Sequence, residues 1–470
     1  MRILLPTGSA TEEIVRCAAG DYDADVVVTG DIASFLTPHM LHTLIKKGQY
    51  DQVIVSGMCT ASFEQVDRET GVPVYRGPRH AADLALILSQ LETITLSPTV
   101  PADEFLTAKK AGDALQRIDQ REQEAGADFV IRGVKIGGGS RMKVLAEIMD
   151  THRCNDLHEK VERFFFAGAD IVDLGFGFDA IPDDVSRAFS LVGDIDRPLA
   201  VDTQDPALIR AALARADLVL SLQEKNISLI GSEIADAGIA AVIVPGDSTL
   251  KKNIAMAKRS GIRCIIADPL LQPVGSGLVA SLKNFRETGH PLFFGAGNVV
   301  ELLDADSIGV NALLAGIANE VGASVIFTSE HSDKTQGSIR EMRQAVEMMV
   351  LAKDRPYPKD LGIDLLVLKE KRKRREPPVE YETVIAAKKM PDEITYDPKG
   401  NFRIGIEGDQ IIAAINGRAV RGRRWQDVFS TILSHGDVTL LDHAGYLGRE
   451  LYKAELAIRY GRSFEQDGEF

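Results

Sequence analysis

Short apolar runs alternate with longer segments of mixed polarity between Phe129 and Gly337. Runs of Val, Ile, Leu and Ala separated by helix-length segments are typical of parallel strands buried on both faces. Eight such runs predict an α/β fold, a closed (β/α)8 barrel of the TIM type. The expected strands are Phe129–Ile136, Asp170–Leu174, Leu199–Val201, Leu218–Leu222, Ala241–Val244, Arg263–Ala267, Pro291–Phe294 and Ser324–Thr328.

The same pattern divides the rest of the chain. Residues 1–100 alternate strand-like and helical runs, which predicts a Rossmann-like α/β domain with an open parallel sheet. Residues 101–127 indicate one linking helix, and the barrel is expected over residues 128–355. A linker at 356–378 then precedes a small α+β domain at 379–470. In that last domain we expect strands at Phe402–Ile406, Gln410–Ile415 and Val438–Leu441.

Composition narrows the classes of partner. The 470 residues are 45% hydrophobic and 26% charged, as in ordinary soluble globular proteins. The formal charge of −14 argues against a general affinity for nucleic acid, and no apolar run is long enough to predict a membrane span. Four cysteines without a CxxC pair argue against structural zinc and fit a reducing cytoplasm, where we expect the protein.

Polar residues follow most of the expected strands, and catalytic residues of such barrels lie at the carboxyl ends of strands. Asp268 follows the sixth expected strand, and its alternative role is to organise the loop before Pro269. Asp202 follows the third. It could instead cap the helix starting near Pro206, but Asp205 already occupies the preferred capping position. The expected strand ends carry Gly137–Arg141, Asp173, Asp202–Thr203, Ser221, Gln223, Asp247, Asp268–Pro269, Gly297–Asn298 and Glu330–Ser332.

Four segments in order carry a family resemblance. "GADIVDLGFG" (168–177), "LAVDTQDPALIRAAL" (199–213), "CIIADPLLQPVGSG" (264–277) and "PLFFGAGN" (291–298) resemble strands two, three, six and seven of dihydropteroate synthases. The layout with two additional domains is similar to the longer dihydropteroate synthase-like proteins of methanogenic archaea and some methylotrophs. The wider superfamily includes corrinoid-linked methyltransferases that bind methylated tetrahydropterins.

The resemblance implies a pterin-binding site. Asp268 matches the aspartate that binds the pterin edge, and Asp202 matches the one that contacts the ring nitrogens. Where the family has an asparagine after strand four, this chain offers Gln223, with Ser221 and Asn226 as alternatives. Where the family has a lysine after strand seven, this chain has the neutral Asn298.

The resemblance also implies groups that hold a leaving diphosphate. His331 resembles the family's histidine, and Lys334 could replace its arginine partner. The family's usual first loop is absent. In its place Gly138, Gly139 and Ser140 could bind an anion together with Arg141, or form a plain flexible loop. Because the first and last strands of a barrel are neighbours, we expect these residues and His331 to form one anion cradle. Mg²⁺ would assist by neutralising the diphosphate, and no metal ligands are assigned.

Three functions follow as hypotheses. The first is condensation of a hydroxymethyl-dihydropterin diphosphate with an arylamine, on the tetrahydromethanopterin or folate route. The second is a methyltransferase subunit that presents a methylated tetrahydropterin to a corrinoid protein. The third is a pterin-binding protein without catalytic activity. The expected partners are small molecules, and a homodimer is compatible with the resemblance because barrel synthases of this type are often dimers.

Overall fold

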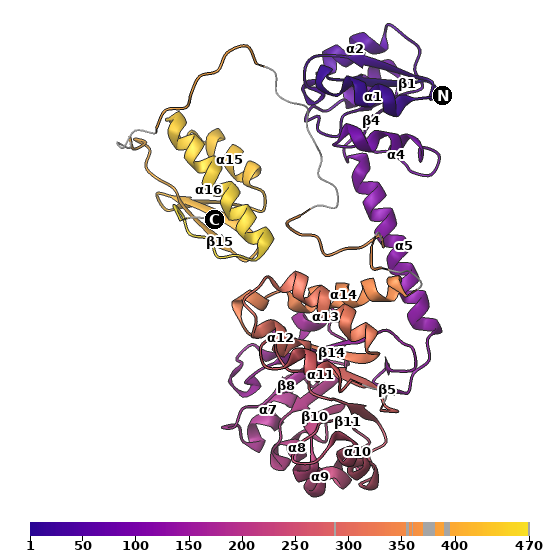
Figure 1. Ribbon diagram of the computed structural model, residues 1–470. Coiled ribbons are helices and arrows are strands. Elements are labelled where there is room, and N and C mark those ends of the chain that lie inside the picture. Colours follow the sequence, from indigo (N-terminus) through magenta and orange to yellow (C-terminus); the bar gives the residue numbers. More distant parts are fainter. Residues whose placement is uncertain (286–287, 354–356, 360, 370–380, 390–394, 469–470) are drawn as a thin grey trace. The chain divides into compact units, whose positions relative to one another are not determined.

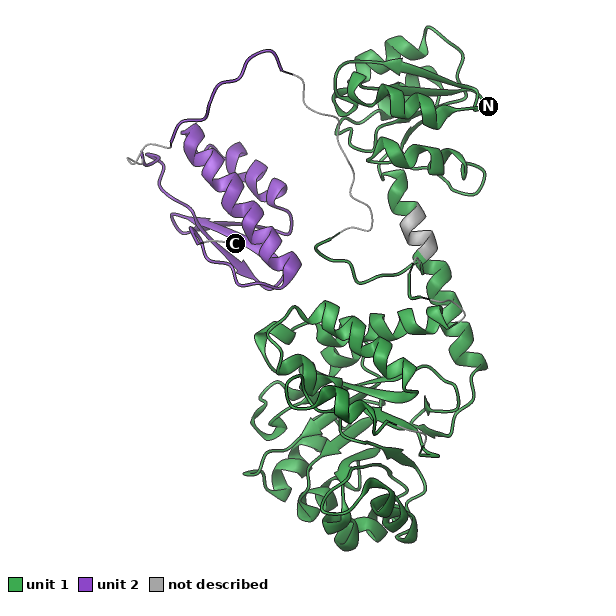
Figure 2. Ribbon diagram, viewed as in Figure 1, with its two compact units in different colours: residues 1–379 green, residues 380–470 purple. Residues whose placement is uncertain are grey.

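The computed structural model describes residues 1–285, 288–353, 357–359, 361–369, 381–389 and 395–468, without the side chains of 106–110. The chain forms two compact units, residues 1–379 and 380–470 (Figure 2). Of the predicted linker at 356–378, residues 356, 360 and 370–378 lie outside the described residues. No helix within the described ranges is long and apolar enough to cross a membrane.

The amino-terminal region folds as the predicted parallel α/β domain. Its strands pair in the order β2-β1-β3-β4, all parallel. One apolar cluster contains Ile3 and Leu5 of β1, and a second contains Leu4, so the sheet is buried on both faces. The elements are β1 (Ile3–Thr7), α1 (Glu12–Ala19), β2 (Ala24–Val28), α2 (Pro38–Ile45), β3 (Gln52–Val55), α3 (Glu64–Thr70), β4 (Val74–Arg76) and α4 (Leu84–Leu88).

Eight parallel strands then close into the predicted barrel, surrounded by helices (Figure 1). Each strand neighbours the next in sequence, and the last pairs with the first. The strands are β7 (Lys143–Ile148), β8 (Ile171–Gly175), β9 (Leu199–Asp202), β10 (Leu218–Leu222), β11 (Ala240–Ile243), β12 (Ile265–Ala267), β13 (Leu292–Phe294) and β14 (Ala323–Ser329). The helices are α6 (Leu157–Ala167), α7 (Pro182–Leu191), α8 (Pro206–Ala212), α9 (Glu224–Asp236), α10 (Leu250–Arg259), α11 (Leu278–Leu282), α12 (Ala296–Glu301), α13 (Ser307–Glu320) and α14 (Ser338–Ala352).

The first barrel strand is β7, so the prediction that Phe129–Ile136 is this strand is wrong. That segment is an antiparallel hairpin, β5 (Phe129–Ile131) and β6 (Val134–Ile136), joined by Arg132 and Gly133 at positive φ. Ile131 and Ile136 belong to the cluster that fills the barrel interior. Arg132 hydrogen-bonds Asp217, which precedes β10. The hairpin therefore covers the amino-terminal end of the barrel.

Side chains of β7 alternate between the two faces of the barrel sheet. Val144, Ala146 and Ile148 pack in the cluster shared with the surrounding helices, whereas Leu145 packs in the interior cluster. Glu147 lies one alternation further along the same interior face, because successive strand side chains point to opposite faces. The helix α5 (Ala102–Glu124), predicted as the linking helix, packs on α14 through Ala114 and Ile118.

The second unit is an antiparallel sheet with two helices, in agreement with the predicted α+β fold. Its elements are β15 (Arg403–Glu407), β16 (Gln410–Ile415), β17 (Arg418–Gly422), α15 (Trp425–Ser434) and α16 (Leu441–Tyr460). The strand predicted at Val438–Leu441 is wrong. The backbone N–H groups of Thr439 and Leu440 donate to buried Asp397 at 2.7 and 3.0 Å, so this segment forms the amino-terminal entry of α16 instead of a strand.

Candidate functional site

Carboxylates from three consecutive strands converge at the carboxyl end of the barrel. In the strand register Glu147 of β7 pairs with Asp173 of β8, and Gly175 pairs with Asp202 of β9. One oxygen of each of the three carboxylates lies within 4.8 Å of the others. A Cβ atom at Gly175 would approach Glu147 Oε1 to 2.7 Å, so this glycine leaves the space that the carboxylate occupies. The three acids thus share one site.

Burial and mutual repulsion favour the neutral forms of these acids. Burial raises the pKa of Asp173 well above its ordinary value, and the charges of Asp202 and Glu147 raise it further. Burial likewise raises the pKa of Glu147 to about 8, with smaller contributions from Asp202 and Asp150. Such shifts are common where function requires a bound cation or a retained proton.

Asp173 is the most unusual of the three. Its side chain is completely buried, and neither carboxylate oxygen has a hydrogen-bond partner among the described residues. A buried carboxylate without a partner is costly, so natural structures usually pair it or place it against a metal ion. The sequence pattern had placed Asp173 at a strand end without assigning it a role.

Asp268 lies at the same end of the barrel, directly after β12, as predicted. It is 7% exposed, and one carboxylate oxygen accepts a hydrogen bond of 2.8 Å from the N–H of Leu270. Burial raises the pKa of Asp268 to about 7; the Leu270 hydrogen bond opposes this rise, and the charge of Asp202 adds to it. The side chain bonds within its loop, as the loop-organising alternative expects, and its role in binding a ligand stays a prediction.

Asp202 ends β9 as predicted, and β10 is distorted next to it. Ser221 adopts a positive φ of 61°, and the β10–β11 register shifts between Val219 and Leu222. Burial raises the pKa of Asp202, and the neighbouring Ser221 hydroxyl opposes this rise only in part, so the net shift is upward. Asp205 caps α8 by accepting a 2.7 Å hydrogen bond from the N–H of Ala207, so Asp202 is not needed as a cap.

Gln223 and Asn226 are used locally at the start of α9. The Gln223 N–H donates to Asn226 Oδ1 at 2.8 Å, and the Gln223 amide donates to Gln204 Oε1 at 3.0 Å. Gln223 is half-buried, whereas Asn226 is buried with its Nδ2 unpartnered within the described residues. Ser221, the remaining candidate for the fourth strand, is the one that reaches Asp202.

The last two strands bring Asn298 and His331 to the carboxyl end. Asn298 lies in the first turn of α12 and is exposed. His331 is exposed, and its N–H donates to Glu301 Oε1 at 3.0 Å. Lys334 forms an ion pair of 2.9 Å with Asp304. The positions after β13 and β14 agree with the prediction, but Lys334 already has a carboxylate partner.

Glu301 organises this loop and was missed in the sequence. One or other of its oxygens accepts hydrogen bonds from the hydroxyls of Ser329, Ser332 and Thr335 at 2.9, 2.6 and 2.7 Å. Burial raises the pKa of Glu301, but these hydrogen bonds lower it by more, so the net shift is downward. It thereby joins α12 to the loop after β14.

The predicted anion cradle is wrong in its geometry. Gly138, Gly139, Ser140 and Arg141 precede β7 and so lie at the amino-terminal end of the barrel, whereas His331 follows β14 at the carboxyl end. The Arg141 side chain is 10% exposed, and its Nη1 donates to Asp170 Oδ2 at 2.7 Å. Ser140 Oγ donates to the carbonyl of Gly137 at 2.8 Å. These residues fix the chain before β7 and do not reach the acid cluster.

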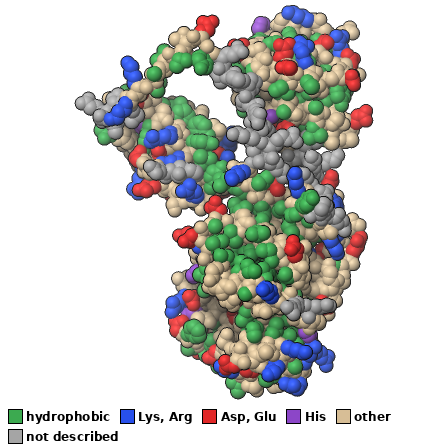
Figure 3. Space-filling model, in the orientation of Figure 1, with side chains coloured by type: hydrophobic (Ala, Val, Ile, Leu, Met, Phe, Trp, Pro, Cys, Tyr) green, Lys and Arg blue, Asp and Glu red, His purple; other side chains and the backbone are tan. Residues whose placement is uncertain are grey.

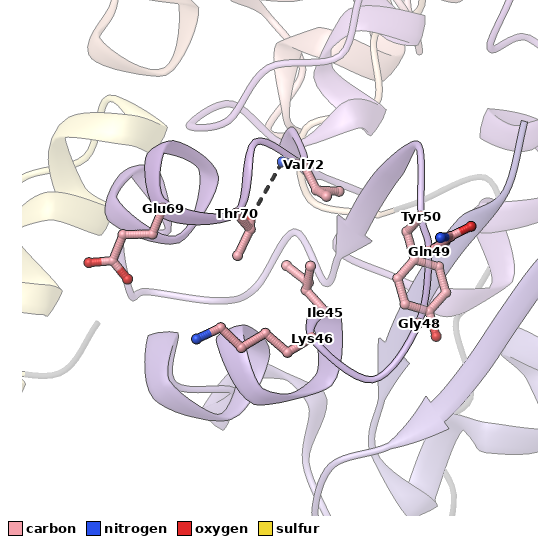
Figure 4. Close-up of a pocket in the computed structure, with 8 residues that line it drawn as sticks. All are labelled: Ile45, Lys46, Gly48, Gln49, Tyr50, Glu69, Thr70 and Val72. Carbon is pink, nitrogen blue, oxygen red and sulfur yellow. Dashed lines mark hydrogen bonds between the residues drawn. The ribbon is translucent and has the colours of Figure 1, made fainter.

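Two hollows lie away from the acid cluster. A cavity of about 1070 Å³ at the amino-terminal end of the barrel is lined by α5, by the glycine segment 137–139 and by residues before β13 and β14. A smaller hollow of about 410 Å³ lies in the amino-terminal domain between α2 and α3, bordered by Tyr50 and Glu69 (Figure 4). On the molecular face shown in Figure 3, acidic and basic side chains are interspersed.

A family model matches part of this chain, and a related protein matches nearly all of it. The family model PterinBD-DUF4346 matches residues 396–467, within the second unit. Uncharacterized protein MJ0107 of Methanocaldococcus jannaschii is 34% identical over 520 residues, which covers 99% of this chain and 98% of that protein.

Solved structures match a smaller part of this chain than the Methanocaldococcus jannaschii protein does. Dihydropteroate synthase from Thermus thermophilus is 20% identical and covers 46% of this chain and 95% of that chain, with a TM-score of 0.37. The Yersinia pestis enzyme with a pterine-sulfa conjugate is 22% identical and covers 48% of this chain and 98% of that chain, with a TM-score of 0.38. The closed order of the strands β7 to β14 identifies the barrel. This chain belongs to the same family as the Methanocaldococcus jannaschii protein, which confirms the predicted likeness to the longer, dihydropteroate synthase-like barrel proteins of archaea.

Proposed function

We propose that the carboxyl end of the barrel binds the 2-amino-4-oxo edge of a pterin. The observation that carries this proposal is the position of two acids, Asp202 and Asp268, at the same end of one barrel. A carboxylate can accept two parallel hydrogen bonds from the pyrimidine N–H groups of a pterin, and this pairing is strong when it is shielded from water. Ser221, Gln223 and Asn298 are the neutral groups that we assign to the remaining polar atoms of the ring.

The reaction we propose is condensation of a hydroxymethyl-dihydropterin diphosphate with an arylamine. The amine nitrogen attacks the pterin methylene carbon, the carbon–oxygen bond breaks, diphosphate leaves, and the nitrogen loses a proton. No strong base is required, because the arylamine is a neutral nucleophile. The protein has to hold both molecules in contact and stabilise the departing charge. His331 and Lys334 are the predicted diphosphate-binding side chains that remain at this end, and Mg²⁺ would neutralise the diphosphate when bound.

A calorimetric titration with the pterin tests the binding site. Asp202→Asn and Asp268→Asn should each weaken binding by about 1–3 kcal/mol, the usual cost of a lost or unpaired buried hydrogen bond. Asp247→Asn is the matched control, because Asp247 follows β11 at the same end of the barrel but is exposed and pairs with Lys225. Unchanged affinity in both site variants would rule out this placement.

One observation favours methyl transfer as the second candidate. Arg141 lies at the opposite end of the barrel and Lys334 is paired with Asp304, which leaves His331 as the one unpaired side chain predicted to hold the diphosphate, among the described residues. A methylated tetrahydropterin carries no diphosphate and needs none of them. Release of pyrophosphate from a pterin diphosphate and an arylamine would support condensation, whereas co-purification with a cobalamin protein and no pyrophosphate release would support methyl transfer. Pterin binding without pyrophosphate release and without a co-purifying cobalamin protein would support the third hypothesis, a pterin-binding protein without catalytic activity.

A further inference from the structure

The three carboxylates of Glu147, Asp173 and Asp202 form a set of hard oxygen ligands. Their nearest oxygen atoms all lie within 4.8 Å of one another. Opposite ligands of a Mg²⁺ octahedron are about 4.2 Å apart, and those around Ca²⁺ are about 5 Å apart, twice their bond lengths. A divalent cation can therefore lie between the three side chains after small rotations. All-oxygen ligands select Mg²⁺, Mn²⁺ or Ca²⁺ over zinc or copper.

Asp173 gives a second and independent indication of a ligand. Its side chain is fully buried, yet both oxygens lack a hydrogen-bond partner within the described residues. Protonation alone does not satisfy this group, because a protonated carboxyl is a donor that also needs an acceptor. Two cations at the start of the barrel do not serve it. Arg141, before β7, pairs with Asp170, and Lys143, the first residue of β7, pairs with Glu122.

The geometry points to a binding site for one divalent cation of the Mg²⁺ or Mn²⁺ class, with Glu147, Asp173 and Asp202 as its protein ligands. This site does not depend on the identity of the organic substrate. Its role does rest on the proposed function: the cation lies at the end of the barrel where the diphosphate would leave. It supplies the positive charge that Arg141, at the other end, cannot supply. Asp202 would contact both the cation and the pterin, one carboxylate oxygen to each, whereas Asp268 follows a different strand and is available to the pterin alone.

Binding of Mn²⁺ alone to the full chain tests the site. The electron paramagnetic resonance signal of free Mn²⁺ should fall to a stoichiometry of one ion per chain. Asp173→Asn and Glu147→Gln should each weaken binding by at least roughly tenfold, since even residues that only support metal ligands cost this much. Asp247→Asn, with an exposed carboxylate at the same end of the barrel, should bind as the unchanged protein does.

Thermal melting shows whether the variants are still folded. Asp173→Asn keeps the size and shape of the buried side chain, so this variant should melt no lower than the metal-free parent, and the rise in melting temperature caused by Mn²⁺ should disappear. If Glu147→Gln and Asp173→Asn, both folded, bind Mn²⁺ as tightly as the parent, or if the parent binds none, the site is overturned. Mn²⁺ binding without pterin binding would leave this site intact and refute the proposed function. Pterin binding without Mn²⁺ binding would refute this cation site and leave the proposed function intact.

Discussion

Asp268 makes the stability of the ligand-free protein depend on pH. Its pKa rises from 3.8 to about 7 on folding, so the folded chain holds a proton that the unfolded chain has lost. Its contribution to stability is therefore complete below pH 4 and is lost as the pH rises toward 7. One pKa unit corresponds to about 1.4 kcal/mol, so the loss is on the order of 3–4 kcal/mol.

Asp268→Asn should remove this dependence. Urea unfolding in the presence of EDTA should give a flatter free energy of unfolding between pH 4 and 7 than in the parent. The variant should be the more stable protein at pH 8. Parallel pH profiles in the two proteins would show that Asp268 ionises in the folded state as it does in the unfolded chain.

Arg141 has a structural role in the fold described above, because it pairs with Asp170 in a buried pair. Arg141→Ala should lower the free energy of unfolding by about 3–5 kcal/mol, because it leaves Asp170 as a buried charge with weaker compensation from Arg343. Arg210→Ala is the control. Its exposed pair with Glu233 should be worth less than about 1 kcal/mol. Chemical denaturation gives both values, and pterin affinity of the folded Arg141→Ala protein should not change.

The position of a polar residue at a strand end could be predicted from the sequence wherever the strand itself had been predicted correctly. Asp202 and Asp268 follow continuous apolar runs, so their position at the carboxyl end of the barrel is readable from sequence. Glu147 was not readable in this way. It lies inside β7, between Ala146 and Ile148, and a charged residue within a short run resembles the polar face of a helix.

The hairpin β5–β6 was predicted as the first barrel strand, and the error has a physical reason. Its side chains are apolar because they fill the end of the barrel, and burial leaves the same compositional signal in a hairpin as in a barrel strand. The distinguishing signal is the Arg132-Gly133 pair within the run, since a two-residue turn requires positive φ. The glycine segment after it was then placed at the wrong end of the barrel.

The hairpin should contribute strongly to the stability of the barrel. Ile136→Ala removes a fully buried side chain from the interior cluster and should cost about 2–5 kcal/mol. Val130→Ala changes an exposed residue of the same hairpin, 56% accessible, and should cost well under 1 kcal/mol. Equal losses in the two variants on denaturant unfolding would argue against the hairpin as a packed part of the core.

At the scale of the whole molecule, the second unit has its own apolar core. Ile404, Ile411, Ile432, Leu447 and Leu451 are buried in one cluster between the sheet and the two helices. Alternating strands and the two amphipathic helices made most of this unit predictable, but β17 was missed because only Val420 among its side chains is a large apolar residue.

A fragment of residues 380–470 should therefore fold without the barrel. Circular dichroism should show mixed helix and strand with one cooperative thermal transition. Ile411→Ala should lower that transition, by the cost of about 2–5 kcal/mol expected for a buried isoleucine, and should leave Mn²⁺ binding by the full chain unchanged. A fragment that shows no cooperative transition would mean that this core requires the rest of the chain.

The closed amino-terminal end of the barrel has a kinetic consequence. With Ile131 and Ile136 filling the interior from one end, a molecule that reaches Asp173 has to enter and leave through the opposite mouth. Whatever binds deepest must arrive first and depart last, because later arrivals cover it. If the proposed condensation is the reaction, its turnover should follow a compulsory order in which the second substrate traps the first. Isotope-labelled pterin diphosphate preloaded on the protein should then be captured into product in proportion to the arylamine concentration.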